Sequence, residues 1–118
     1  MIDETMTRRL RVELEAQREN LRREIEEQGG DPDHDEAAID VERGFADSAH
    51  STAERARLLS VMKALRANLR WVDRALRKME LGTYGTCERC GRPIPLERLE
   101  ALPWAILCID CKRAGEGR

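Results

Sequence analysis

The chain has 118 residues, of which 37% are charged and only 3% are aromatic, and its formal net charge is −2. This length allows one domain, or one elongated element with a small module, and the sparse aromatic content argues against a compact globule with a large core. Long helices bathed in solvent fit the charged composition better. Because no apolar run is long enough to span a bilayer, we expect a soluble, cytoplasmic protein without a membrane partner.

A first helix is predicted from Asp3 to about Gln28. Its apolar positions follow one helical face, which Gln17 interrupts, and they are Met6, Leu10, Leu14, Leu21 and Ile25. The run GGDP at 29–32 combines the strongest breakers of helical structure, so the helix is expected to end there.

A connection of about twenty residues follows at 29–51, and it concentrates the acidic charge of the chain. It carries seven acidic residues against one basic residue, so the remainder of the chain has a net positive charge of +4. Helix–helix loops of this length are usually disordered or functional, and residues 36–43 could add a helical turn or two. Composition alone leaves open whether the charge serves a partner or only solubility. His34 and His50 have no nucleophile arranged beside them, and we expect them to be solvated.

A second helix is predicted from Thr52, as its cap, to Leu81, with Gly82 in the position of a C-terminal glycine. No glycine or proline interrupts this stretch. Its apolar residues alternate at spacings of four and three, which is the pattern of a coiled coil, and they are Leu58, Met62, Leu65, Leu69, Val72, Leu76 and Met79.

Neither amphipathic helix can bury its apolar stripe alone, so the two are expected to pair as an antiparallel hairpin. Dimerisation through the second helix is the alternative, but the first helix offers a partner within the chain and we expect a monomer. The predicted fold is all-α. A coiled-coil hairpin occupies 1–81, with arms at 3–28 and 52–81, and a zinc finger with a short tail occupies 82–118.

Four cysteines, the only ones in the chain, form two Cys-x-x-Cys pairs separated by seventeen residues: Cys87, Cys90, Cys108 and Cys111. Two such pairs can surround one zinc ion tetrahedrally. Four thiolates leave no open coordination position for water or substrate, so the predicted role of the metal is structural. We therefore expect no enzymatic activity.

Other uses of the four cysteines fit the sequence less well. Two disulfides would suit a secreted protein, but the first residues include no apolar signal segment. Thioredoxin-like redox chemistry usually accompanies a βαβ pattern, and none is found here. An iron–sulfur cluster would also take four thiolates and remains an alternative that colour would distinguish.

Between the cysteine pairs, residues 96–102 are predicted to form a short helix. The apolar residues of this region form one cluster, expected to pack on the base of the hairpin near Leu76, Met79 and Tyr84. Its members are Leu99, Leu102, Trp104, Ile106 and Leu107.

The C-terminal third contains the runs GTYGTCERCG at 82–91, PI at 93–94, RLEALP at 98–103 and LCIDCK at 107–112. Together they resemble the zinc finger of the DksA/TraR family. A preceding helix with heptads also resembles that family, whereas the first helix is similar only in architecture.

The resemblance implies a regulator of transcription that binds bacterial RNA polymerase rather than promoter DNA. In the family, the hairpin enters the secondary channel of the polymerase, and acidic residues at its tip approach the catalytic centre and modulate initiation. The alternative function is a zinc-finger protein that binds DNA. Two features argue against it, since the chain lacks a basic recognition helix and only two lysines precede the finger.

The family tip carries an Asp-x-Ala element with a further aspartate three residues earlier. Here the element is matched by Asp47 and Ala49, while Gly44 stands in place of the earlier aspartate. A second match begins at Asp35 and lies further from the finger. The resemblance implies that Asp47 and Ala49 contact the polymerase, with Asp35 as the second choice.

Some members of the family also use the nucleotide ppGpp, held partly by a lysine that follows the last cysteine. Lys112 matches this lysine and is a possible contact for the nucleotide or the polymerase. Residues 64–71 are poorer in basic side chains than the corresponding stretch of members that respond to ppGpp. A requirement for ppGpp is therefore not expected.

Overall fold

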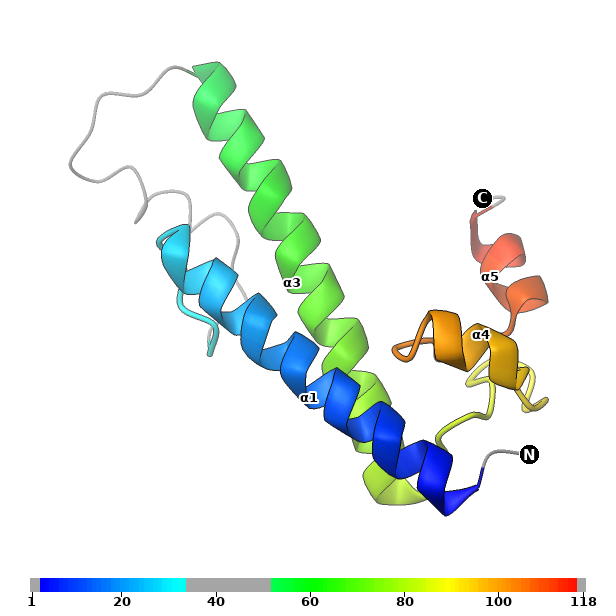
Figure 1. The fold of residues 1–118 in the computed structure, drawn as a ribbon. Helices are drawn as coiled ribbons and strands as arrows, with labels where there is room; N and C mark the ends of the chain where they lie inside the picture. The colour runs from blue at the N-terminus through cyan, green and yellow to red at the C-terminus, as the bar shows by residue number, and fades with distance from the viewer. Residues whose placement is uncertain (1–2, 34–51, 117–118) are drawn as a thin grey trace. The chain divides into compact units, whose positions relative to one another are not determined.

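The computed structural model describes residues 3–33 and 52–116, and four helices lie within these ranges. They are α1 (Glu4–Glu27), α3 (Thr52–Leu81), α4 (Leu96–Ala101) and α5 (Ile109–Glu116) (Figure 1). No strand is found in the described ranges, and Thr86 and Pro93 form an isolated antiparallel bridge. The predicted all-α fold is confirmed. None of the described helices has both the length and the apolar character needed to cross a membrane.

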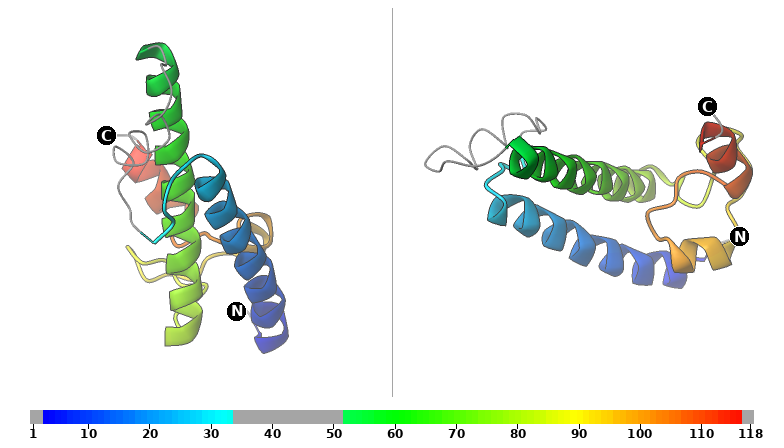
Figure 2. Two further views of the ribbon diagram at one scale, coloured as in Figure 1. Left: turned by 90° about the vertical axis from the view of Figure 1, so that its left-hand side faces the viewer. Right: turned by 90° about the horizontal axis from the view of Figure 1, so that it is seen from above.

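The described residues divide into two compact units. One comprises the described residues within Met1–Gln17 and Trp71–Arg118, and the other comprises those within Arg18–Arg70. Within each unit, a stretch of α1 lies beside a stretch of α3 and runs in the opposite direction (Figure 1, Figure 2). This is the antiparallel pairing that the two amphipathic patterns predict.

Helix α1 begins and ends with local hydrogen bonds that its sequence supplies. The Asp3 carboxylate caps the first turn by accepting a hydrogen bond of 2.8 Å from the Met6 N–H. At the other end Gly29 adopts a positive φ of 93°, and the N–H of Gly30 donates to the carbonyl of Ile25 over 2.9 Å. This is a Schellman ending, in which glycine adopts the left-handed conformation without steric cost.

Helix α3 ends in the same way, directly before the finger. Gly82 has a φ of 75°, its N–H donates to the Met79 carbonyl at 3.3 Å, and the Thr83 N–H donates to the Lys78 carbonyl at 2.9 Å. The start differs from the expectation. Thr52 is itself the first helical residue, so the capping position falls one residue earlier, outside the described part of the chain.

Both apolar stripes are buried or half-buried, as their periodicity predicts. In the unit Arg18–Arg70 the core consists of Ile25, Met62 and Leu69, against which Leu21, Leu58 and Leu65 pack while partly buried. In the other unit the buried apolar residues of α1 and α3 are Leu10, Leu14, Val72, Ala75 and Met79. Burial of such side chains stabilises each unit by about 1.5–3 kcal/mol per large residue.

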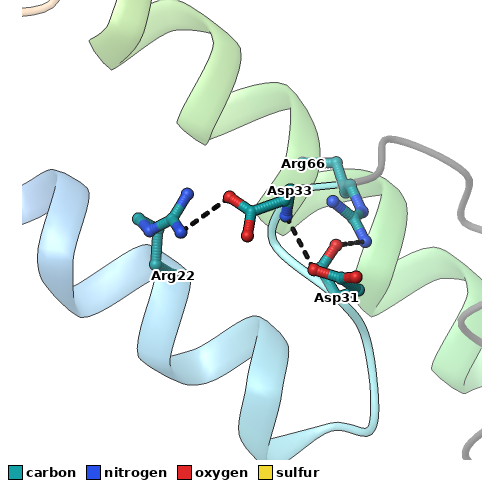
Figure 3. A network of polar contacts seen from close by, with 4 residues as sticks. All are labelled: Arg22, Asp31, Asp33 and Arg66. Atoms are coloured by element: carbon teal, nitrogen blue, oxygen red, sulfur yellow. Dashed lines mark hydrogen bonds and ion pairs between the residues drawn. The ribbon is translucent and has the colours of Figure 1, made fainter.

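Two arginines hold the first residues of the connection against the helices of the unit Arg18–Arg70 (Figure 3). Arg66, only 3% exposed, donates from a guanidinium nitrogen to the carbonyl of Asp31 at 2.7 Å. Arg22 forms an ion pair of 2.8 Å with the Asp33 carboxylate, and the Asp33 N–H donates to the Asp31 carboxylate at 2.9 Å. The Asp33 carboxylate is therefore paired with a basic side chain of α1, and the backbone of Asp31 is bonded to one of α3.

Candidate metal centre

The structure brings together the four cysteines of the two Cys-x-x-Cys pairs. Their Sγ atoms all lie within 4.8 Å of one another, and those of Cys90 and Cys108 are 3.7 Å apart. Four thiolates at about 2.3 Å from one tetrahedral zinc ion would be separated by about 3.8 Å, so the cluster fits one such ion. A disulfide would need about 2.05 Å between sulfurs, and all four cysteines are free.

The first pair lies in a tight turn that follows α3. The carbonyl of Cys87 accepts a hydrogen bond of 3.0 Å from the N–H of Gly91, whose φ is 76°. Outside this turn, the Cys87 N–H donates to the backbone carbonyl of Arg92 at 2.9 Å, and the Ile94 N–H donates to the backbone carbonyl of Gly85 at 2.7 Å. Gly85, with a φ of 88°, lets the chain reverse there. The loop presents Cys87 and Cys90 on one side.

The second pair is held by the start of α5. Cys108 directly precedes this helix, Cys111 lies in its first turn, and the N–H of Lys112 donates to the Cys108 carbonyl at 3.0 Å. A further backbone hydrogen bond of 2.9 Å, from Glu88 to Ile106, joins the two cysteine loops. The ligand geometry is thus built mainly by the backbone.

The thiols differ in acidity because their surroundings differ. Burial raises the pKa of the Cys87 thiol, but hydrogen bonds from the backbone of Cys108, Cys90 and Arg89 outweigh burial and lower the pKa to about 6. The pKa of Cys111 is raised to about 12, by burial and then by hydrogen bonds with the three other thiols. Four neighbouring thiols cannot all ionise without a compensating cation, and a divalent metal ion supplies that charge.

The finger has a small apolar core. Leu99, Ile94 and Ile106 are 1–4% exposed, and the buried Tyr84 donates its hydroxyl to the carbonyl of Pro103 at 2.8 Å. Burial, and next the charge of Glu13, raises the Tyr84 pKa to about 12. The hydroxyl therefore stays protonated and keeps its role as a donor.

The predicted apolar cluster of the finger is buried only in part. Leu99 and Ile106 are buried as expected, whereas Leu102, Trp104 and Leu107 are half-buried. The short helix also ends at Ala101 rather than at residue 102. The backbone carbonyl of Leu107 accepts a hydrogen bond of 3.1 Å from the Arg98 side chain. This polar contact joins α4 to the segment before Cys108.

The predicted tip residues Asp47, Ala49 and Asp35 lie outside the described residues, as do both histidines. Lys112 is described, and its Nζ lies 5.5 Å from the centre of the Trp71 ring, a cation–π geometry. The role predicted for Lys112 in binding a nucleotide or the polymerase stays a prediction.

Sequence reasoning missed a buried cation next to the cysteine loops, Lys78, which is only 6% exposed. Its position in the last turn of α3 gave a partial signal, because positive side chains are favoured at a helix C-terminus. Nothing in the heptad pattern indicates that its side chain is buried.

Comparison with known proteins places the finger in a described group. Residues 82–116 match the family model of the prokaryotic dksA/traR C4-type zinc finger, which agrees with one structural zinc ion held by four cysteines. The RNA polymerase-binding transcription factor DksA of Caulobacter vibrioides is 40% identical over 74 residues, covering 63% of this chain and 52% of that protein. General stress protein 16O of Bacillus subtilis is 40% identical over 72 residues, covering 61% and 44%. The chain spans about half or less of the length of these curated relatives.

Solved structures match over nearly the whole chain. Transcription factor DksA2 from Pseudomonas aeruginosa is similar with a TM-score of 0.71 and 28% identity, over 98% of this chain and 87% of that one. The RNA polymerase binding protein and transcriptional regulator Dks from Chlamydia trachomatis has a TM-score of 0.59 over 99% and 94%. Its identity is 21%, so this second likeness concerns the fold alone.

Proposed function

Because this chain belongs to the DksA/TraR family, we propose that it is a transcription regulator that binds bacterial RNA polymerase. The proposal is supported by the agreement of two matches, one to a family model and one to a solved structure. The C4 finger matches at 82–116, and the fold of DksA2 covers 98% of the chain. Relatives whose names state that they bind RNA polymerase align with up to 63% of this chain. A shared finger alone would support a weaker conclusion.

We further propose that the paired helices enter the secondary channel of the polymerase, with the acidic connection acting at its inner end. Helices of 24 and 30 residues are about 36 and 45 Å long at 1.5 Å per residue, a reach suited to a deep channel. Carboxylates brought near a magnesium site and basic catalytic residues would alter the local field and the occupancy of the metal. Asp47, with Ala49 beside it, is the proposed acting residue, and Asp35 is the second choice.

In this account the zinc ion is structural. The four cysteines would hold it, and it would supply a rigid tetrahedral junction with no open coordination position. The chain's own residues do the remaining work. The two cysteine loops fix the finger. Tyr84 bonds to Pro103 within the finger, and Arg74 bonds the C-terminal part of α3 to Glu88 of the finger.

Photo-crosslinking to purified RNA polymerase tests the proposal. A photoreactive amino acid at position 47 should crosslink to polymerase segments that line the active centre. The same group in place of the exposed Arg113, on α5, should crosslink elsewhere on the enzyme. Binding without a crosslink from position 47 to the active centre would reject the channel mode and leave polymerase binding intact. Absence of binding and of both crosslinks would reject the proposed function.

A further inference from the structure

One buried positive charge in the described part of the chain lies beside the metal centre without being one of its ligands. Lys78 stands in the last turn of α3 and is 6% exposed. Its Nζ donates a hydrogen bond to the backbone carbonyl of Thr86, the residue directly before the ligand Cys87. Ordering a lysine side chain and removing its ammonium from water are both unfavourable, so a compensating interaction is expected at this site.

The main chain of Lys78 holds the other end of the same short link. Its carbonyl accepts a hydrogen bond of 2.9 Å from the N–H of Thr83 and one of 3.5 Å from the Thr83 hydroxyl. A single residue of α3 is therefore bonded to the first and the last residue of 83–86, the segment that joins the helix to the metal centre.

The charges around the Lys78 ammonium are mixed. Burial lowers its pKa, while the negative charges of Glu88 and Cys87 act in the opposite direction and Arg74 adds to the lowering. Arg74 and Glu88 are themselves paired at 2.8 Å, which reduces the net effect of both on Lys78. Four thiolates around one divalent ion keep a net negative charge, so the loaded centre would add to the attraction from Cys87.

We propose that Lys78 is a positioning residue for the metal centre. It fixes the backbone that leads into Cys87, through the Thr86 carbonyl, and its charge offsets the negative charge of the zinc tetrathiolate. Partners of this kind, one step removed from the ligands, commonly set metal affinity. The inference depends on the zinc site and is independent of polymerase binding.

The first test measures zinc affinity of the full chain by competition with a chromogenic chelator. Lys78→Met should bind zinc about 10–100-fold more weakly than the parent, and Lys78→Arg should recover part of the loss because it keeps a charged donor. Arg77→Met is the matched control, since Arg77 is the exposed neighbour on the same helix, and it should change affinity less than about twofold. Equal zinc affinities for Lys78→Met, Arg77→Met and the parent would overturn the proposal.

A second measurement uses the unaltered protein and so does not depend on the folding of a variant. An amine-acetylating reagent is applied to the zinc-loaded chain, and each lysine is followed by mass spectrometry. Lys78 should be at least about tenfold more slowly modified than the exposed Lys63 of α3, because its ammonium is buried and bonded. Removal of zinc with a chelator should raise the rate at Lys78 and leave that at Lys63 within about twofold. Similar rates for the two lysines in the loaded protein would contradict the inference.

Discussion

The guanidinium of Arg74 lies 2.8 Å from the carboxylate of Glu88, and this pair connects α3 with the loop between the first two cysteines. Glu88 also donates its N–H to Ile106, before the second pair of cysteines. One short segment therefore contacts the helix and both halves of the metal centre, which explains how a small finger can be oriented on its helix within this unit.

The ion pair itself should contribute little to stability. The Arg74 side chain is 62% exposed, and pairs in solvent are worth about 0–1 kcal/mol. Arg74→Ala and Glu88→Gln should each lower the free energy of unfolding by less than about 1 kcal/mol, as measured by urea denaturation. A double-mutant cycle with a coupling energy well above that value would show that the contact carries more of the finger's orientation than its exposure suggests.

The hydrogen bond of Tyr84 should contribute more, and its contribution should depend on pH. Tyr84→Phe should cost about 1 kcal/mol, because it removes a buried hydrogen bond to Pro103. The folded protein raises the pKa of this phenol to about 12, against about 10 when unfolded. The folded state thus favours the protonated form, so this contribution is fully present below about pH 10 and is lost as the pH rises toward 12.

Urea titrations of the zinc-loaded protein between pH 8 and roughly 11 would measure this effect. The difference in unfolding free energy between parent and Tyr84→Phe should shrink above about pH 10. A difference that stays constant across the series, or grows, would be incompatible with a raised pKa.

Loss of one ligand should be far more severe. Structural zinc contributes on the order of 10 kcal/mol of apparent folding free energy, so Cys87→Ser should abolish stable zinc binding and the cooperative melting of the finger. Zinc content by atomic absorption and thermal melting by circular dichroism are the measurements. Treatment of the parent protein with a strong chelator should reproduce the behaviour of the variant. A variant that retains zinc and melts like the parent would refute the structural role.

The proposed acting residue should affect regulation without affecting binding. Asp47→Asn removes one negative charge, so polymerase affinity should change less than about twofold while the effect on transcription in a purified system falls by about tenfold or more. Asp35→Asn is the matched control and should change neither by more than about twofold. If Asp35→Asn abolishes regulation and Asp47→Asn does not, the assignment of the two aspartates is reversed.

The features that the sequence predicts well are those that depend on local pattern. The glycines at 29 and 82 end α1 and α3 within a residue of the expected positions, because a Schellman ending needs a positive φ that glycine adopts readily. The heptad positions identify the buried face of α3. Cysteine spacing predicts the cluster, because two Cys-x-x-Cys loops can each direct both sulfurs to one side.

Other features depend on which segments meet in the folded chain, and no local pattern signals them. Arg66 and Lys78 lie on the same helix as many exposed basic residues, and only tertiary contacts make them buried donors to backbone carbonyls. Likewise, the distance between Lys112 and Trp71 joins residues forty-one positions apart in sequence. Composition assigned Asp33 to a connection with seven acidic residues and one basic residue, whereas in the structure its charge is paired with Arg22 of α1.

We propose that this chain acts on RNA polymerase through a fold organised by one zinc ion. The most direct measurement is the binding of the zinc-loaded full chain to purified bacterial RNA polymerase, monitored by biolayer interferometry. Binding to a duplex DNA that contains a promoter is measured separately in the same way. Saturable binding to the enzyme is expected, and it should be lost when zinc is removed, whereas no binding to the bare DNA is expected at physiological salt. Binding to DNA alone, with no affinity for the polymerase, would contradict it.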